Sequence, residues 1–146
     1  MSNEEIMKIA LQEAEVAVHE GNAPFACVVA NENGEVVLRE HDRVKERMDP
    51  TAHGEINAIR TLCKKLNTLS LSKYIFYTTS EPCPSCMAGM IKAQVPAVFY
   101  GANTERTASL PIPAAFIASK SRKYPIKVTG GILAEAALRQ RERLSK

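Results

Sequence analysis

The sequence has no hydrophobic run long enough to cross a membrane. Its longest uncharged runs fall well short of the roughly 20 apolar residues that a transmembrane helix requires. The first residues, MSNEEIMK, are acidic and amphipathic, unlike an export signal with a charged tip before an apolar block. These absences predict a cytoplasmic protein that does not use a membrane as a partner.

Internal repeats, low-complexity segments and a strong excess of one charge are also absent. Charged residues make up 24% of the 146 residues and hydrophobic residues 45%, which is ordinary for a globular protein. The net charge of +3 is too small to require or to exclude a nucleic-acid partner. The length predicts one domain, residues 1–146, that buries roughly two-thirds of its unfolded surface.

Cysteine is scarce, with four residues. In a chain without an export signal, thiols and metal ligands are more common than disulfides. Cys63 lies in the apolar-periodic segment IRTLCKKL and Cys27 in the strand-like segment FACVVA, so both are predicted to be buried core residues. The pair Cys83 and Cys86 needs another explanation.

Helix and strand patterns alternate along the chain. Ser2 and Glu5 form a capping-box pattern that opens the first helix, which is expected to run to Gly21. Two β-rich runs around an Asn33-Gly34 turn then predict an antiparallel hairpin. Further helices are expected over 51–66, after the SEPCPSC segment, over 114–119 and over 132–144, and strands over 25–30, 35–41, 74–79, 97–102 and 126–131. This order predicts an α/β fold, a three-layer α/β/α sandwich with a mixed sheet and helices on both faces.

Two of the expected helices begin at residues that commonly bind metals. His53 lies at a helix start in DPTAHGEINAIR, and Cys83 lies at another in SEPCPSC. Helix N-termini carry unpaired N–H groups and partial positive charge, which lower the pKa of a nearby thiol. Cys83 and Cys86 are three residues apart, on one side of the first turn. Two thiolates and one imidazole, with water in the fourth position, are typical of a catalytic zinc site.

Glu55 is the candidate proton carrier for such a site. It follows His53 by two positions, roughly 200° around a helix, but at a helix terminus both side chains can lean toward one metal. Zinc lowers the pKa of its bound water toward neutral values, and a carboxylate can take the released proton. The alternatives are a capping or core role for His53, an ordinary first-turn acid at position 55 and a redox role for the CxxC pair. Both motif halves occur in order and without a thioredoxin-like context, which favours catalytic zinc.

Through TAHGEINAIR followed by SEPCPSCMAGMI, the chain resembles the zinc-dependent cytidine deaminase superfamily. The resemblance covers nearly the whole chain and is greatest to guanine deaminases, tRNA adenosine deaminases and fungal-type cytosine deaminases. It implies a five-stranded sheet, a homodimer and a Zn²⁺ cofactor held by His53, Cys83 and Cys86. It also implies that Glu55 moves protons while the ring carbon bearing an exocyclic amine is attacked and ammonia leaves.

The same resemblance implies substrate-binding positions. The Gly54 N–H is expected to face a substrate carbonyl, and carbonyls near Ser80 to receive the leaving amine. Phe25 matches an aromatic-bearing loop beside the base, although a core position at a strand start explains it equally well. Asp42 stands where relatives carry Asn, and because an ionised Asp only accepts hydrogen bonds it favours a base edge with N–H donors or a cationic ligand. The alternative for Asp42 is a strand-end salt bridge with Arg43.

Departures from the relatives' patterns bear on the substrate. Guanine deaminases place an acidic pair near the segment that reads LPIPAAFIAS here, and a Trp where Lys92 stands, which weakens guanine as the substrate. The tRNA enzymes carry a KTGAAGS-like loop where this chain reads ERTASLP, although GGILAEAAL resembles their closing helix. Arg139 and Arg143, with Lys146 one turn further, are more typical of a solvated face than of a phosphate track.

The sequence therefore predicts a hydrolytic zinc deaminase that acts on a free nucleobase or related small heterocycle, guanine-like or cytosine-like. The rival within enzymes is a tRNA adenosine-to-inosine deaminase, with tRNA as the less favoured partner. The alternative that is not an enzyme is a zinc-stabilised binding module, in which Asp42 makes the pocket unsuitable for catalysis.

Overall fold

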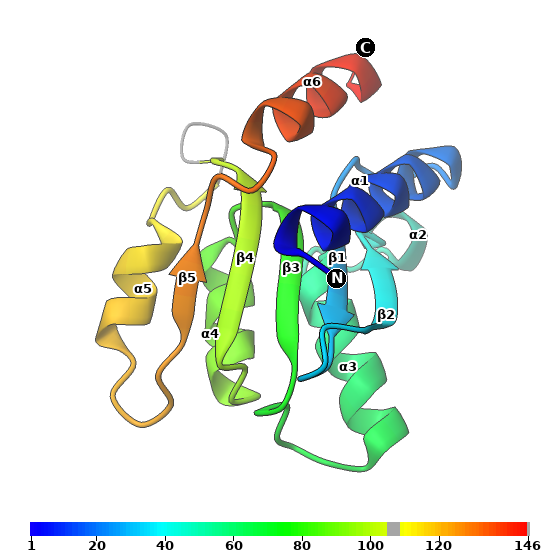
Figure 1. Ribbon diagram of the computed structural model, residues 1–146. Helices are drawn as coiled ribbons and strands as arrows, with labels where there is room; N and C mark the ends of the chain where they lie inside the picture. Colours follow the sequence, from blue (N-terminus) through cyan, green and yellow to red (C-terminus); the bar gives the residue numbers. More distant parts are fainter. Residues whose placement is uncertain (105–108, 146) are drawn as a thin grey trace.

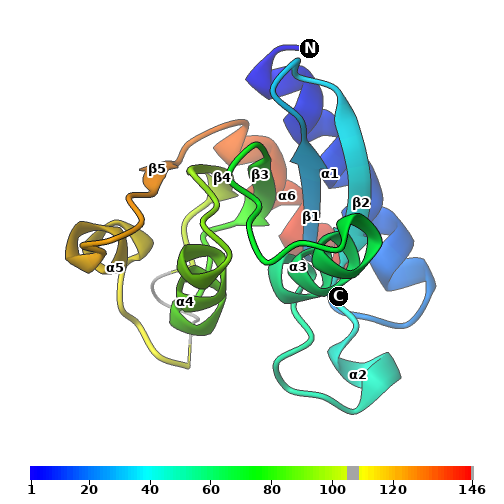
Figure 2. The same cartoon turned by 90° about the horizontal axis from the view of Figure 1, so that it is seen from below.

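The computed structural model describes residues 1–104 and 109–145. A five-stranded sheet forms the middle layer, and helices cover both of its faces (Figures 1 and 2). Helices α1 (Asn3–His19) and α6 (Ala134–Leu144) lie on one face, and α3 (Gly54–Leu66), α4 (Pro84–Lys92) and α5 (Ala114–Lys120) on the other. The predicted three-layer α/β/α architecture is confirmed.

The sheet is mixed, with the strand order β2-β1-β3-β4-β5. Strands β1 (Ala26–Ala30) and β2 (Val36–His41) form the predicted antiparallel hairpin, and β1 also pairs antiparallel with β3 (Ile75–Ser80). Strands β3, β4 (Ala97–Ala102) and β5 (Lys127–Thr129) run parallel to one another. The carboxyl ends of β3 and β4 therefore meet at one edge of the sheet, and the chain passes from β3 almost directly into α4.

The sheet separates two apolar cores, because successive strand residues point to opposite faces. In β1, Cys27 and Val29 belong to the core beneath the α3 and α4 helices, whereas Val28 belongs to the core under α1. The larger core also contains Leu62, Phe76, Met87, Met90 and Val98, and the smaller one contains Ile6, Met7, Ala10 and Tyr77. Every residue of β1 is buried, so this strand reads as a continuous apolar run.

The capping box at the start of α1 is confirmed. Ser2 Oγ accepts a hydrogen bond from the Glu5 N–H at 3.1 Å, and Glu5 Oε1 accepts one from the Ser2 N–H at 3.2 Å. The helix ends at His19, two residues before Gly21, which has a φ of +89°. A positive φ is accessible to glycine at little cost, so the chain can turn there toward β1.

The prediction that a helix begins at Thr51 is wrong by three residues. Asp49 Oδ1 accepts hydrogen bonds from the Thr51 N–H at 2.8 Å and the Thr51 hydroxyl at 2.7 Å, which fixes a turn. His53 then has an extended backbone, with φ −70° and ψ 159°, and stands at the N-cap of α3. Local side-chain bonding therefore holds residues 49–52 out of the helix.

Two further details differ from the predictions. A short helix, α2 (Val44–Arg47), follows β2 and was not predicted, because its four residues present no buried side chain that would give a periodic pattern. Cys63 is half-buried at the edge of the larger core, whereas Cys27 is fully buried as predicted.

The described residues contain no helix that is both long enough and apolar enough to span a membrane.

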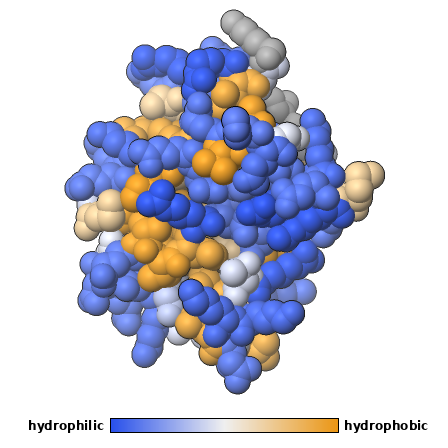
Figure 3. All heavy atoms as spheres, turned by 90° about the vertical axis from the view of Figure 1, so that its right-hand side faces the viewer, coloured by the Kyte–Doolittle hydropathy of each residue, from blue (hydrophilic) through white to orange (hydrophobic). Residues whose placement is uncertain are grey.

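Figure 3 shows the face that lies at the right-hand side of Figure 1. Apolar residues gather toward the left of this view, and hydrophilic residues occupy most of the remaining surface.

Candidate metal centre and active-site pocket

Two helix starts bring the metal-type ligands together. His53 is the N-cap residue of α3 and Cys83 the N-cap residue of α4, and both have extended backbone angles. Pro84 occupies the first turn of α4, where its missing N–H and fixed φ favour helix initiation. Because α3 and α4 pack side by side on one face of the sheet, their N-termini converge.

The three ligand atoms form a nearly equilateral triangle. His53 Nδ1 lies 3.5 Å from Cys83 Sγ and 3.5 Å from Cys86 Sγ, and the two sulfurs are 3.5 Å apart. Metal–ligand bonds of about 2.3 Å to sulfur and about 2.0 Å to nitrogen in a tetrahedron place ligand atoms roughly 3.5–3.8 Å apart. The spacing therefore fits a tetrahedral ion with its fourth position open.

The protonation of the three side chains is strongly coupled. Hydrogen bonding to Cys86, assisted by His53 and Ser85, lowers the pKa of Cys83 to about 3. The bond to Cys83 raises the pKa of His53 to about 9, against the opposing effect of burial. Hydrogen bonding to Cys83 and burial raise the pKa of Cys86 well above its ordinary value. Metal binding requires deprotonated thiols and a neutral imidazole, so an ion bound by these three side chains would displace their protons.

Glu55 lies beside this triangle. The residue is 8% exposed, and burial raises the pKa of its carboxyl group to about 7, partly offset by the positive charge of His53. The Glu55 carboxyl group also contributes to the raised pKa of the Cys86 thiol. A buried carboxyl group that titrates near neutral pH suits a proton carrier.

A cavity of about 490 Å³ opens over the triangle. Its walls include His53, Glu55 and Cys83, whereas Cys86 is fully buried. Phe25 and Asp42, at the two ends of the hairpin, also line it. The structure thus gathers the predicted site residues around one cavity, which is large enough for a small heterocycle.

Gly54 packs against β1 at the floor of the cavity. A Cβ at this position would meet Cys27 Cβ at 3.1 Å and the Cys27 nitrogen at 3.2 Å, closer than ordinary contacts. Glycine therefore lets the first turn of α3 approach the sheet. This approach brings the Gly54 backbone to the cavity wall.

The contact between Arg141 and Phe25 was not predicted from the sequence. The Arg141 guanidinium from α6 lies 5.4 Å from the centre of the Phe25 ring and donates a hydrogen bond to Ser80 Oγ. Burial lowers the pKa of Arg141. Phe25 is half-buried in the cavity wall and belongs to neither apolar core. Because β1 and α6 lie far apart in sequence, no local pattern could have revealed this contact.

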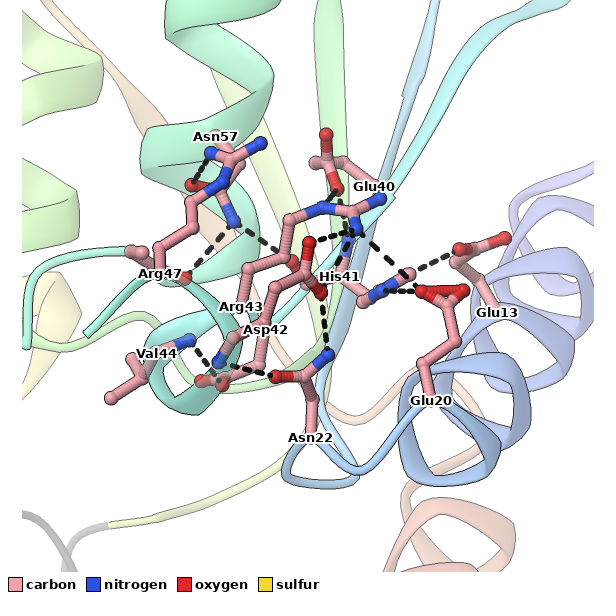
Figure 4. Close-up of polar contacts among 12 residues, drawn as sticks. Glu13, Glu20, Asn22, Glu40, His41, Asp42, Arg43, Val44, Arg47 and Asn57 are labelled. Carbon is pink, nitrogen blue, oxygen red and sulfur yellow. Dashed lines mark hydrogen bonds and ion pairs between the residues drawn. The ribbon is translucent and has the colours of Figure 1, made fainter. Parts of the chain in front are cut away.

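Asp42 makes backbone contacts and no ion pair with Arg43 among the described residues. Its Oδ1 accepts from the Val44 N–H at 3.1 Å, and its own N–H donates to the Phe25 carbonyl at 2.9 Å. Arg43 instead pairs with Glu40 at 2.7 Å and with glutamates of neighbouring segments (Figure 4). The strand-end salt bridge proposed as the alternative for Asp42 is therefore not formed.

Lys92 is exposed at the end of α4, and it is not among the described residues that line the cavity. Arg139 pairs with Glu135 and Arg143 pairs with Glu15, as expected for a solvated helix face. The loop ERTASLP falls partly outside the described residues, although its Ser109 and Leu110 line the cavity.

The family model for the cytidine and deoxycytidylate deaminase zinc-binding region matches residues 1–102, which include both halves of the motif. The chain belongs to this family. Zinc is thus the metal of this deaminase, and the cluster of His53, Cys83 and Cys86 has the donor set and spacing to hold it.

Relatives of the deaminase include enzymes with two types of substrate. It is 36% identical to the tRNA-specific adenosine deaminase of Aquifex aeolicus (strain VF5) over 102 residues, 70% of this chain and 67% of that one. It is 36% identical to the guanine deaminase of Bacillus subtilis (strain 168) over 118 residues, 80% of this chain and 75% of that one. A solved structure from studies of A-to-I editing by tRNA:A34 deaminases matches with a TM-score of 0.81 and 28% identity, covering 92% of this chain and 96% of the other.

Proposed function

We propose that the deaminase is a zinc-dependent aminohydrolase that releases ammonia from a free nucleobase or related small heterocycle, guanine-like or cytosine-like. The observation that carries the proposal is the placement of buried Glu55 beside the His53, Cys83 and Cys86 triangle, with Glu55, His53 and Cys83 lining one cavity.

In this proposal His53, Cys83 and Cys86 hold the zinc ion. When bound, zinc supplies an acidified water molecule to the reaction. Glu55 would take a proton from the attacking water and deliver it to the ring nitrogen beside the reacting carbon. It would then take the proton of the hydroxyl group added to that carbon and pass it to the amine, which leaves as ammonia. The low exposure of Glu55 keeps this proton away from bulk solvent.

Three residues are proposed to orient the base. Phe25 offers its ring face, which Arg141 supports from α6. The Gly54 N–H donates to a substrate carbonyl. Asp42 accepts from N–H donors on the base edge, a pattern that guanine and cytosine both provide through ring N–H or amino groups.

The rival function is tRNA adenosine deamination, which the similarity to tRNA-specific enzymes favours. Zinc-loaded protein should be screened for ammonia release from free bases and nucleosides, and for inosine in an anticodon stem-loop. Release from a free base supports the proposal. Conversion of RNA alone would replace it with the rival, and inactivity toward every compound would favour a zinc-stabilised binding module.

The resemblance also supports a homodimer as part of the proposal. Light scattering coupled to gel filtration should give twice the mass of the 16.0 kDa chain. A monomer over the concentration range used in assays would remove this part and leave the chemistry unaffected.

A further inference from the structure

A second cluster of metal-type ligands lies outside the zinc site, where the end of α1 meets the end of β2 and α2 (Figure 4). One ligand atom each from Glu20, His41 and Glu46 lies within 4.8 Å of the other two. These residues come from three separate segments of the chain. None of them has a role in the proposed deamination.

His41 is the buried member of the cluster. Its side chain is 1% exposed, and its Nδ1 lies 2.5 Å from Glu13 Oε2. A carboxylate can only accept, so Nδ1 carries the proton of this bond. The Nε2 atom on the other side of the ring is buried and makes no hydrogen bond to the described residues.

The unpartnered Nε2 faces negative charge. It lies 3.3 Å from Glu20 Oε1, without hydrogen-bond geometry. In a neutral imidazole with its proton on Nδ1, the lone pair of Nε2 would lie close to this carboxylate without pointing directly at the oxygen. An imidazole lone pair close to a carboxylate oxygen is repelled by it, and a positive species between the two atoms would remove this repulsion. A metal ion or a second ring proton can be this species.

The surroundings of His41 carry an excess of negative charge. Arg43 donates through Nε to Glu40 at 2.7 Å and through a terminal nitrogen to Glu46 at 3.1 Å. Its terminal nitrogen is 3.6 Å from Glu20. The carboxylates that face this arginine and the His41 ring are those of Glu13, Glu20, Glu40 and Glu46. Arg43, with the charge of Arg47 also acting on Glu46, does not neutralise four carboxylates, and a divalent cation would offset the difference.

The groups around the candidate ligands are already oriented. A metal-bound histidine usually donates its other ring N–H to a carboxylate, which fixes the ring and raises its basicity. Glu13 is in this position relative to His41. The Asn22 amide donates to Glu46 Oε1 at 2.9 Å and holds this carboxylate at the cluster, while Oε2 accepts from Arg43 at 3.1 Å.

We propose that His41 Nε2, Glu20 and Glu46 form a second metal site, for a divalent transition-metal ion such as Zn²⁺, Mn²⁺ or Co²⁺. An imidazole ligand favours these ions over Mg²⁺ and Ca²⁺, which prefer oxygen alone. Glu20 and Glu46 are exposed, and water completes the coordination. The site binds more weakly than the thiolate site, because Arg43 must release Glu46 while it keeps Glu40.

The second ion would tie the end of α1 to β2 and α2. Because His41 immediately precedes Asp42, it would also fix the backbone beside the cavity. The proposal does not depend on which substrate the deaminase uses.

The test is equilibrium dialysis of protein that already holds zinc at His53, Cys83 and Cys86, against rising free Zn²⁺, followed by elemental analysis. A second equivalent per chain is expected. Glu20→Gln and Glu46→Gln should each weaken its binding by about tenfold or more, and Glu13→Gln by about 10–100-fold, the loss typical of outer partners. The control Glu135→Gln, at an exposed ion pair on α6, should bind like the wild type.

Three results would overturn the proposal. The first is the absence of a second equivalent, and the second is unchanged binding in both Glu20→Gln and Glu46→Gln, which are exposed positions. The third is nitrogen NMR that shows His41 protonated on both ring nitrogens at saturating Zn²⁺, because the second proton would then occupy the metal position. Loss of the first zinc alone in Cys83→Ala, with the second retained, would support two independent sites.

Discussion

Glu55 combines a carboxyl group, near-complete burial and a place beside three metal-type ligands. In Glu55→Gln the side chain keeps its shape but cannot accept a proton. We expect kcat to fall by about 10²-fold or more, since general acid–base groups typically contribute 10²–10⁴-fold. Zinc content and the unfolding midpoint should stay near those of the wild type. Steady-state kinetics with elemental analysis check this, and unchanged turnover would assign the proton transfer to another group.

Cys83 links the fold to the metal. Cys83→Ala should lose the zinc and unfold at lower denaturant concentration, because part of the metal-binding free energy is folding free energy. Cys63→Ala is the matched control, since Cys63 is half-buried and outside the ligand triangle. Zinc analysis and urea unfolding of both variants test the assignment. A Cys83→Ala protein with its full zinc content would refute it.

Asp42 tests the recognition of the base. Asp42→Asn gains an N–H₂ donor where the carboxylate could only accept. We expect the ratio of kcat/KM between two bases to change by roughly tenfold or more, with zinc retained. The measurement is a comparison of purine and pyrimidine bases on both proteins. An identical profile would mean that Asp42 acts only through its bonds to Val44 and Phe25.

At the scale of single elements, the start of α1 offers a clean test of stability. Ser2→Ala removes one half of the capping box, which should lower the free energy of unfolding by about 1 kcal/mol. Deaminase activity and zinc content should not change, because Ser2 is not among the described residues that line the cavity. Urea unfolding measures the loss, with Ser145→Ala at the exposed end of α6 as the control. Equal stability of both variants would show that the cap contributes nothing.

Most elements were predictable because they have a strong periodic pattern or a clear end signal. Strands β1 and β4 lie where the apolar runs placed them, and the capping box located the start of α1. The zinc-type ligands were predictable because each stands at a helix start. The turn before α3 was not, because Pro50 and Thr51 suggested a helix while the side chain of Asp49 held them in a turn.

Contacts between distant segments could not be read from the sequence. The pair of Phe25 and Arg141 joins opposite ends of the chain, and the bond of Glu13 to His41 joins α1 to β2. Each residue alone has an ordinary local setting, such as a solvated helix face or a strand end. Only the packing of α1 and α6 on the same face of the sheet creates these neighbours.

At the scale of the whole molecule, substrate identity should appear as a change in thermal stability. A ligand that binds only the folded protein stabilises it by mass action, by about 2.7 kcal/mol at 100 times its Kd. Thermal melts of zinc-loaded Glu55→Gln with candidate bases should therefore show a raised midpoint for the true substrate. Metal added together with a base can also raise the midpoint. Each melt therefore needs a blank that contains the same metal concentration and no base.

The central claim is that His53, Cys83 and Cys86 together bind one zinc ion. Elemental analysis of protein purified without chelators, after dialysis to remove weakly held metal, measures this directly. The account predicts about one zinc per chain, a count typical of a three-ligand catalytic site, and nearly none in Cys83→Ala. Wild-type protein that contains no transition metal and cannot take any up would contradict it.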